Sequence, residues 1–354
     1  MSQPVPTVAS PELLRFIREI FAALGVSNHA AELAASSLAA ASVRGVDSHG
    51  VQLLPLYVDQ LASGDVDGKA TGRIVSETGC CVVYDGENGL GQSIAAACCD
   101  HAVRLARSSG MGMAVARNSN HFGSAGFWGA RIAEAGCLGI VLSNASPLVA
   151  PWQGREPRLG TNPICVAAPG GWILDMATTS ASAGKIIDAV MEGSAAIPAE
   201  WALDAAGNPT TSPSEALKGT LLPLGGHAAG YKGSGLAVAV EILCGVLSGG
   251  AMASEVGSLR KRGRAAGVSQ TFLAIHIGRF MPVTEFESRV ARLVAMLKST
   301  APAPGFEEVL MAGEPEVRSE EQRQISGIPI PRRLWVTLER LADRFQVTRL
   351  HPLG

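Results

Sequence analysis

The chain of 354 residues is 47% hydrophobic and 17% charged, so it has ample apolar material for packed cores and is not a disordered protein. At about 150 residues per domain, this length predicts two or three compact units. The 29 basic and 31 acidic residues leave a net charge of -2, which provides no phosphate-attracting field and argues against nucleic-acid binding.

The cysteines and the apolar segments predict a cytoplasmic protein. The seven cysteines form no C-x-x-C motif, so we expect free thiols in a reducing compartment and no structural zinc. No two histidines have the helical spacing of a zinc protease, and no metal site is expected. The first residues lack the basic and apolar regions of a signal peptide. The most apolar stretch, 235–251, is interrupted by Glu241, so no membrane association is expected.

Residues 1–72 are expected to form an all-helical unit, because apolar residues recur there at helical spacing. Ser10 followed by Pro11 is typical of a helix start, with the serine as the capping residue. Pro55 is expected to kink or break the third helix. The three expected helices cover residues 10–24, 27–44 and 51–62.

Residues 73–283 are expected to form a mixed α/β unit, because short β-branched runs alternate there with helical stretches. The expected strands cover residues 81–84, 113–116, 138–142, 164–168, 171–174 and 271–277. The expected helices cover residues 91–108, 125–135, 182–191 and 235–249.

Residues 284–354 return to a helical pattern, with helices expected over 284–298 and 331–345. Leu338 and Leu341 share one face of the last helix. This order of segments predicts an α+β fold, in which the two chain ends pack together as one helical domain. The mixed sheet would then form a domain inserted between them.

The conventional nucleotide-binding and nucleophile motifs are incomplete in this sequence. Gly110-x-Gly112 begins a dinucleotide fingerprint, but Val115 replaces its third glycine and the following residues resemble a strand. A Walker-type loop near Gly225 has Tyr231 where a lysine is required. The glycine-flanked serines lack the hydrolase spacing. These failures argue against a Rossmann site, an NTPase and a hydrolase.

Polar residues gather instead in five turn-like clusters, of which the first is RGVDSHG over residues 44–50. It places Asp47, Ser48 and His49 between two helices. An imidazole on a loop can donate or accept a proton near neutral pH, which is the chemistry of a general acid or base. The structural alternative is that Asp47 and Ser48 cap the next helix while His49 is hydrogen-bonded locally.

The second cluster, RNSNHFGSAG over residues 117–126, follows a strand and precedes a helix, where active-site side chains are often presented. His121 is its candidate catalytic group. The polar side chains of residues 118–120 can each bond to backbone in turns, so a structural loop with a satisfied His121 is the alternative.

The other three clusters are rich in hydrogen-bond donors. LGTNPI (159–164) and ILDMATTSASAGK (173–185) flank two expected strands, and Asp175 precedes a loop of hydroxyl side chains that can hold a carboxylate, ribose or phosphate. Its alternative is an ordinary helix cap. GGHAAGYKGSG (225–235) combines a helix start, glycine backbone and Lys232, which together predict an anion site.

Taken in order, these clusters resemble the type 2 malate/L-lactate dehydrogenase family of NAD(P)-dependent oxidoreductases. That family also includes 2,3-diketogulonate reductases, ureidoglycolate and sulfolactate dehydrogenases, and cyclic imino-acid reductases. The resemblance covers almost the whole chain. The motifs that carry it are RGVDSHGV, RNSNHFG, GTNP, DMAT with GK following, GYKGSGLAVAVEILCGVLSGG, and AGEPE before GIP.

The resemblance implies a cofactor domain of non-Rossmann type and a homodimer. Residues 73–283 would bind NAD or NADP and the small-molecule substrate, and residues 284–354 would pack on residues 1–72. His49 would be the proton donor in reduction, Ser48 its partner in a hydrogen-bonded relay, and His121 a second histidine at the substrate. The implied substrate contacts are Thr161, Asn162, Ala183 and Gly184. The implied cofactor contacts are Asp175, Met176, Ala177, Tyr231, Lys232, Gly313, Glu314 and Pro315.

One departure from the family pattern affects the substrate. Members commonly carry an arginine five residues after the motif serine, where it holds the substrate carboxylate, but Leu53 stands there in this chain. Either another cation replaces it, with Arg44, Arg117 and Lys185 as the candidates, or the substrate differs at that end.

Three functions follow from the resemblance, in order of preference. Lys185 stands where imino-acid reductases of the family can carry an acid, which favours a 2-hydroxy-acid/2-oxo-acid couple. The alternative within enzymes is reduction of a cyclic imino acid, Δ1-pyrroline-2-carboxylate or Δ1-piperideine-2-carboxylate. Outside enzymes, the alternative is an inactive dinucleotide-binding protein. The sequence does not discriminate NAD from NADP.

Overall fold

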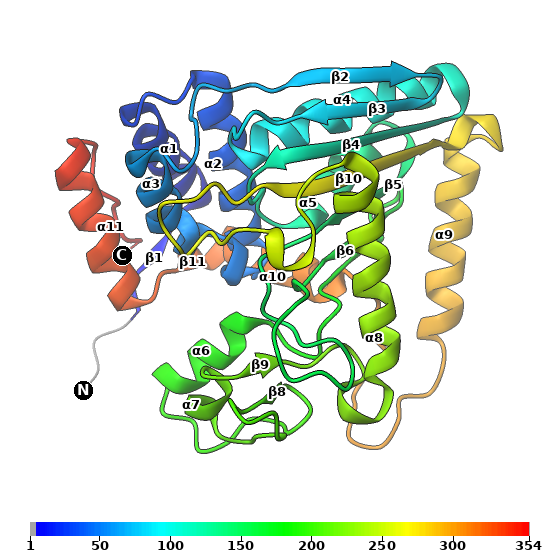
Figure 1. The fold of residues 1–354 in the computed structure, drawn as a ribbon. Coiled ribbons are helices and arrows are strands. Elements are labelled where there is room, and N and C mark those ends of the chain that lie inside the picture. Colours follow the sequence, from blue (N-terminus) through cyan, green and yellow to red (C-terminus); the bar gives the residue numbers. More distant parts are fainter. Residues whose placement is uncertain (1–4, 354) are drawn as a thin grey trace.

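A seven-stranded mixed sheet forms the centre of the protein, whose computed structural model describes residues 5–353 (Figure 1). Its strands lie in the order β2-β3-β4-β10-β5-β6-β7; β3 and β4 are parallel, and the other neighbours are antiparallel. The strands are β2 (Arg73–Thr78), β3 (Cys81–Asp85), β4 (Met111–Ser119), β5 (Cys137–Ser143), β6 (Ile164–Ala167), β7 (Ile173–Met176) and β10 (Val268–His276).

The structure confirms all six expected strands and adds β2, which the sequence analysis missed. All six residues of β2 are exposed, so this edge strand lacks the alternation of apolar and polar residues that marks a half-buried strand. The parallel sheet of a doubly wound dinucleotide fold differs from this arrangement, in which antiparallel pairs predominate.

Two helices, α4 (Gly91–Ser109) and α5 (Ala125–Glu134), pack on one face of the sheet. The core between them contains the fully buried Trp128 and Phe272. The Trp128 indole donates a hydrogen bond of 2.8 Å to the Phe122 carbonyl, so the ring is fixed in the turn between β4 and α5. Both helices match the expected ranges.

The helix α8 (Gly226–Glu241) continues into the π-helical turn η3 (Ile242–Val246) and packs against β5 and β10. Leu142 faces this helix and the adjacent Val141 faces α5, which places the two helix layers on opposite faces of the sheet. The expected helix over 235–249 is therefore wrong at its start and right at its end, because helical backbone runs from residue 226 to residue 248. The glycines that we assigned to a loop form the first turns of this helix.

The two ends of the chain meet in a second, helical core. β1 (Thr7–Val8) pairs with β11 (Ile328–Pro329), and apolar side chains of the first helices and of the last helix share one buried cluster. Figure 1 shows this helical part beside the sheet. Its helices are α1 (Ser10–Ala23), α2 (Asn28–Val43), α3 (Leu54–Ser63), α10 (Glu314–Ser326), which contacts α2, and α11 (Arg332–Phe345).

Several details of this helical part differ from expectation. Ala9, and not Ser10, is the capping residue of α1. Pro55 lies in the first turn of α3 and begins this helix without kinking it, because proline needs no hydrogen-bond partner there. α10 was missed because it has few apolar residues and none that is buried.

The remaining elements complete the chain. α9 (Val283–Lys298) matches expectation, but it runs along the edge of the molecule in Figure 1 and none of its residues is buried. Within residues 5–353, no helix combines the length and apolarity needed to cross a membrane. The short elements between β7 and α8 are α6 (Ala183–Met191), β8 (Ala202–Leu203), α7 (Pro213–Ala216) and β9 (Thr220–Leu221).

A close backbone contact at Gly91 links α4 to the loop after β4. A Cβ atom at Gly91 would lie 2.2 Å from the Asn120 carbonyl oxygen and 2.3 Å from that of His121. We therefore expect Gly91→Ala to lower the free energy of unfolding by about 1–3 kcal/mol. Ser93→Ala is the control, since it removes a buried hydroxyl that has no hydrogen bond within residues 5–353. Equal melting temperatures for the two variants would contradict the close contact.

Candidate active site

Two histidines from distant parts of the sequence face each other. His49 lies in the 3-10 turn η1 (Asp47–His49) after α2, and His121 follows β4. Their rings are stacked, with centroids 5.6 Å apart and an interplanar angle of 24°. The Ser48 hydroxyl oxygen lies 2.9 Å from Nδ1 of His49. The structure therefore brings together all three residues that the sequence analysis named as catalytic.

Hydrogen bonds outside the site hold the His49 turn in place. The Val51 amide donates to the Ser42 hydroxyl over 2.9 Å, and Gly50 packs so closely on Ser42 that a Cβ atom would have no room. Asp47 accepts two hydrogen bonds from Arg323 of α10, of 2.6 and 2.9 Å. Neither Asp47 nor Ser48 caps a helix, whereas His49 does have the local hydrogen bond of the structural alternative, to its neighbour Ser48.

In the second cluster the asparagines stabilise the loop, and His121 is hydrogen-bonded within it too, because its Nδ1 accepts from the Gly123 amide over 3.3 Å. Asn118 donates 3.1 Å hydrogen bonds to both oxygens of Asp85, and Asn120 donates to the Gly89 carbonyl over 2.8 Å. Asn118 adopts a positive φ of 51°, which asparagine tolerates better than most residues. The turn is thereby fixed while His121 points at His49.

Both histidines are neutral at neutral pH. Burial lowers the pKa of His49 below its ordinary value. Burial also lowers the pKa of His121, to about 3, and the nearby charges of His49 and Arg260 lower it further. Two imidazolium ions at this separation would repel each other, so at most one of the pair is charged at a time.

The start of α6 lies beside Ser48. A Cβ atom at Gly184 would be 3.4 Å from the Ser48 Cβ. The Ser182 hydroxyl caps the helix by accepting from the Lys185 amide over 3.3 Å. The amides of Ala183 and Gly184 belong to the first helical turn, where backbone donors have no partner within the helix. This end of α6 can therefore bind an oxygen-rich group.

The three candidate replacements for the missing arginine differ in their partners. Arg44 pairs with Glu320 over 3.1 Å, and Arg117 pairs with Asp85 over 3.2 Å. Lys185 lies over the Trp201 ring, 5.7 Å from its centroid, and has no ion-pair partner among residues 5–353. Leu53, at the family's arginine position, is buried in the helical core. Lys185 is thus the candidate cation that remains available.

The predicted substrate and cofactor loops lie side by side. The Thr161 carbonyl accepts hydrogen bonds from the backbone amide and the hydroxyl of Thr178, of 2.9 and 3.1 Å. Asp175 is the last residue but one of β7 and accepts a 2.6 Å hydrogen bond from the Gly126 amide at the start of α5. The protein surrounding Asp175 raises the pKa of its carboxyl to about 6, although one side remains open to solvent. Met176 and Ala177 connect Asp175 to Thr178.

The third predicted cofactor segment, Gly313 to Pro315, lies against β7. A Cβ atom at Gly313 would be 2.8 Å from the Ile173 carbonyl oxygen, and the residue has a φ of 84°, so glycine is required there. The Glu314 carboxylate accepts hydrogen bonds from the Met311 amide, 3.1 Å, and from Arg318, 2.7 Å, and pairs with Lys298. It is therefore engaged within the C-terminal part of the chain.

Asn162 has a structural position that the sequence did not reveal. The side chain is fully buried, accepts from the Ala145 amide over 3.1 Å, and donates 3.0 Å hydrogen bonds to the Ala237 carbonyl and the Glu241 carboxylate. These bonds use both of its amide hydrogens and tie the loop of Thr161 to α8. In this structure Asn162 therefore stabilises the loop that carries Thr161.

The anion site predicted at the start of α8 needs correction. The helix start does receive an anion, but it is the chain's own Glu200, which accepts a 2.6 Å hydrogen bond from the His227 amide. Tyr231 packs on Trp152 at 5.6 Å, and the Lys232 ammonium lies 5.9 Å from the Tyr231 ring. Both side chains are exposed in the next turn. Within residues 5–353, no hydrogen bond or ring contact joins them to the histidine pair.

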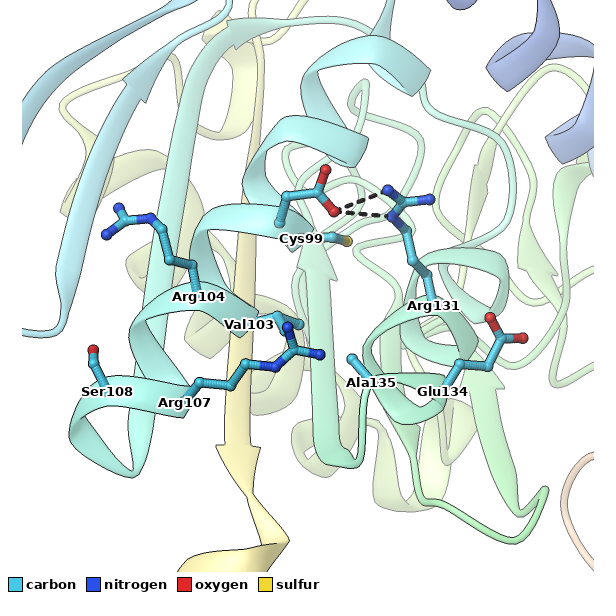
Figure 2. A pocket seen from close by; sticks show the side chains of 9 residues that line it. Cys99, Val103, Arg104, Arg107, Ser108, Arg131, Glu134 and Ala135 are labelled. Atoms are coloured by element: carbon cyan, nitrogen blue, oxygen red, sulfur yellow. Dashed lines mark hydrogen bonds and ion pairs between the residues drawn. The ribbon is translucent and has the colours of Figure 1, made fainter.

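A surface cavity of about 810 Å³ lies elsewhere, between α4 and α5 (Figure 2). Arg104, Arg107 and Arg131 line it, and Arg131 pairs with Asp100 over 2.9 Å. Arginines in the last turns of helices complement the helix dipoles. None of the predicted site residues lines this cavity, so its volume does not mark the site of the histidine pair.

Comparison with known proteins identifies the family of this chain. The sequence profile described as malate/L-lactate dehydrogenase matches residues 8–339. The chain belongs to this family. It is 38% identical to the malate dehydrogenase of Pyrococcus horikoshii over 97% of this chain and 96% of that protein. It is 34% identical to the L-sulfolactate dehydrogenase of Methanocaldococcus jannaschii, over 93% and 94% of the two chains.

A solved structure agrees with the fold as well. The malate dehydrogenase of Entamoeba histolytica, 30% identical, superposes with a TM-score of 0.94 over 98% of this chain and 99% of that one. Because its family and relatives are dehydrogenases and reductases, this protein is an oxidoreductase. Its relatives are named for small hydroxy acids, and the family's enzymes depend on a pyridine nucleotide.

Two residues at the site escaped the sequence analysis. Tyr57 of α3 donates a 2.6 Å hydrogen bond to Nδ1 of His121, but in the sequence it is indistinguishable from the apolar face of its helix. Arg260 has no ion-pair partner among residues 5–353, and its charge is close enough to lower the pKa of His121. Its loop is tied to α3, where Gln60 donates 2.8 Å to the Leu259 carbonyl. Only the fold brings this loop to the site.

The lowered pKa of His49 gives this dehydrogenase a specific pH dependence. If His49 donates the proton in reduction, its imidazolium form is required, and kcat/KM for reduction should fall as the pH rises through the pKa of His49 in the free enzyme. Oxidation needs the neutral form and should rise over the same range, with a midpoint below 6.5. Ser48 and His121 are the polar groups facing this ring. Rate profiles in both directions measure the midpoint, and a midpoint above 6.5 would contradict the burial of His49.

Proposed function

We propose that this protein is an NAD(P)-dependent dehydrogenase that interconverts a small 2-hydroxy acid and its 2-oxo acid. The observation that carries this proposal is the neutral, stacked pair of His49 and His121 beside the open start of α6. The relatives named for malate and sulfolactate support it, since both compounds are 2-hydroxy acids.

His49 is the proton donor in the direction of reduction. A bound dihydronicotinamide supplies the hydride that reaches the planar carbonyl carbon. The carbonyl oxygen then gains charge and takes a proton from Nε2 of the His49 imidazolium, whose Nδ1–H is held by the Ser48 hydroxyl. In the reverse direction, neutral His49 accepts the proton of the substrate hydroxyl.

The start of α6 and the Thr161 loop bind the substrate. The free amides of Ala183 and Gly184 donate to its oxygens, and Thr161 contacts it from the neighbouring loop. Asn162 acts through this loop, which its hydrogen bonds attach to α8.

The residues around β7 and α8 fit a dinucleotide. One oxygen of Asp175 holds Gly126, while the other makes no hydrogen bond within residues 5–353 and can accept from a ribose hydroxyl. Met176 and Ala177 extend this edge, and the backbone of Gly313 to Pro315 lies next to it. Tyr231 supplies a ring face, and Lys232, which has no ion-pair partner among residues 5–353, supplies a cation for the phosphates. This donor set suits NAD and NADP alike.

Two cations without an ion-pair partner among residues 5–353 replace the missing arginine. Lys185 follows Gly184, which lies against Ser48, and its ammonium lies over the Trp201 ring; Arg260 lies on the loop tied to α3, near His121. The C1 carboxylate of the substrate would pair with one of these cations, and a second anionic group of the substrate would pair with the other. Malate and sulfolactate each carry two such charges. The site therefore favours a dianionic 2-oxo acid over a monoanionic one.

Removing either cation tests this charge pattern. Lys185→Met and Arg260→Met should each raise KM for a dianionic 2-oxo acid by about 10- to 100-fold, because a lost charge-assisted bond costs about 1.5–3 kcal/mol. Arg262→Met is the matched control on the same loop, since Arg262 already pairs with Asp59 over 2.9 Å. Unchanged KM values in both test variants would remove these cations from the substrate site.

The proposed function is tested by a substrate panel with NADH and NADPH. Oxaloacetate-type and pyruvate-type 2-oxo acids should be reduced, and Δ1-pyrroline-2-carboxylate or Δ1-piperideine-2-carboxylate should not. Reduction of the cyclic imines alone would establish the alternative enzyme. Tight binding of a dinucleotide without turnover of any substrate would indicate an inactive binding protein. In the same titrations, Lys232→Ala should weaken dinucleotide binding.

We also propose that the protein forms a homodimer through α8, η3 and α9. Ile242 and Val246 are more than half exposed, and Leu293 and Met296 of α9 are exposed to 56% and 60%. A sixteen-residue helix with an apolar stripe and no buried residue lacks a partner within residues 5–353. In the view of Figure 1, α9 is drawn beside α8. A second copy of this chain is the occupant that the family resemblance implies.

A charge on this face tests the dimer. Ile242→Glu should convert the dimer into a monomer, because a buried carboxylate without a partner costs several kcal/mol. Sedimentation velocity measures the mass of each species. Glu285→Gln is a control on the exposed side of α9, where Glu285 pairs with Arg289. A monomeric unaltered protein, or a dimer that survives Ile242→Glu, would contradict this interface.

A further inference from the structure

The hydrogen bonds around His121 determine which of its nitrogens carries the proton. Nδ1 lies 2.6 Å from the Tyr57 hydroxyl and 3.3 Å from the Gly123 amide nitrogen. A backbone N–H can only donate, so Nδ1 is an acceptor and cannot itself hold a proton. The single proton of the neutral ring is therefore on Nε2.

Tyr57 is rigidly held for this contact. Its side chain is 1% exposed and its ring packs edge-on against Phe21, at a centroid distance of 6.1 Å. The hydroxyl also lies 3.3 Å from the His121 carbonyl oxygen, and the Gln92 side chain is within its reach. The contact with Nδ1 of His121, at 2.6 Å, is shorter than the contact with that carbonyl.

We propose that Tyr57 is a positioning residue that, together with the Gly123 amide, holds His121 as the neutral Nε2–H tautomer. The amide at 3.3 Å disfavours a proton on Nδ1, and the hydroxyl at 2.6 Å makes the shorter contact with that nitrogen. In this form His121 donates a hydrogen bond to the substrate oxygen, while His49 alone transfers the proton. The inference rests on the proposed dehydrogenase reaction and adds a division of labour between the two histidines.

The hydrogen-bond partners of the His49 and His121 rings differ, as this division of labour between the two histidines requires. Ser48 is partly exposed, and its hydroxyl can donate to neutral His49 or accept from the imidazolium, so His49 can change its charge. Nδ1 of His121 meets the Gly123 amide, which cannot reverse its role. Protonating Nδ1 would place two N–H groups against each other, so His121 keeps its charge throughout the cycle. A fixed neutral donor stabilises a developing oxyanion without reorganisation.

The position of the proton is tested by NMR spectra of the ring nitrogens in ¹⁵N-histidine-labelled protein without ligands. His121, assigned by its absence in His121→Gln, should show a protonated Nε2 and an unprotonated Nδ1. In Tyr57→Phe these signals should move toward the average of two exchanging tautomers. Tyr84→Phe is the matched control, because Tyr84 is also buried but donates to the Thr71 carbonyl. A protonated Nδ1, or spectra unchanged by Tyr57→Phe, would overturn the proposal.

The role of His121 is tested by comparing two replacements. Glutamine offers a neutral N–H donor near the position of Nε2, and leucine offers none. His121→Leu should lower kcat by about 10²- to 10³-fold, and His121→Gln should retain at least about tenfold more activity than the leucine variant. Tyr57→Phe should lower kcat by about tenfold with little change in KM. If His121 transferred the proton, both replacements of His121 would be equally slow, which would overturn the division of labour.

The proposed dehydrogenase reaction and the proposed role of Tyr57 are contradicted by different results. A protein that reduces no 2-oxo acid contradicts the proposed reaction, whereas the ring-nitrogen spectra decide the Tyr57 contact without any substrate. Turnover together with a wrong tautomer contradicts only the role of Tyr57.

Discussion

The contact between the rings of His49 and His121 is the constraint on which the rest of the structure depends. At a centroid separation of 5.6 Å the two rings cannot both be charged, so the surrounding protein has to set their protonation separately. It does so with one hydroxyl at each Nδ1, that of Ser48 and that of Tyr57. The helical part of the chain supplies His49 and Tyr57, and the sheet supplies His121. The site therefore exists only where these two parts meet.

The architecture explains how this meeting point is held. The pairing of β1 with β11 closes the helical part, and Arg323 of α10 reaches back to Asp47 in the turn that carries His49. On the other side, α4 fixes the His121 loop through the close approach at Gly91. The start of α6 then covers Ser48. Segments separated by more than 250 residues in sequence thus contribute to one small polar region.

Much of this was predictable from the sequence, because strand alternation and helical spacing are local signals. The motifs around Ser48, His49 and His121 named three residues that the structure brings together, and their catalytic role remains a proposal. The failures have physical causes: β2 is exposed along its whole length, α10 has too few apolar residues, and the glycines after 225 form helix where their composition suggested a loop. The position of the Glu200 carboxylate at the start of α8 could not be predicted from the sequence, because Glu200 belongs to a different segment of the chain. The domain boundaries at residues 72 and 283 remain predictions.

The measurement that tests the account most directly is the transfer of deuterium from NADH or NADPH labelled at nicotinamide C4 to C2 of the product, followed by mass spectrometry. The unaltered protein should place the label on C2 of a 2-hydroxy acid. His49→Ala should do so about 10²- to 10⁴-fold more slowly while still binding the dinucleotide. Absence of the label from every product, or an undiminished rate of transfer in His49→Ala, would contradict the central role of the histidine pair.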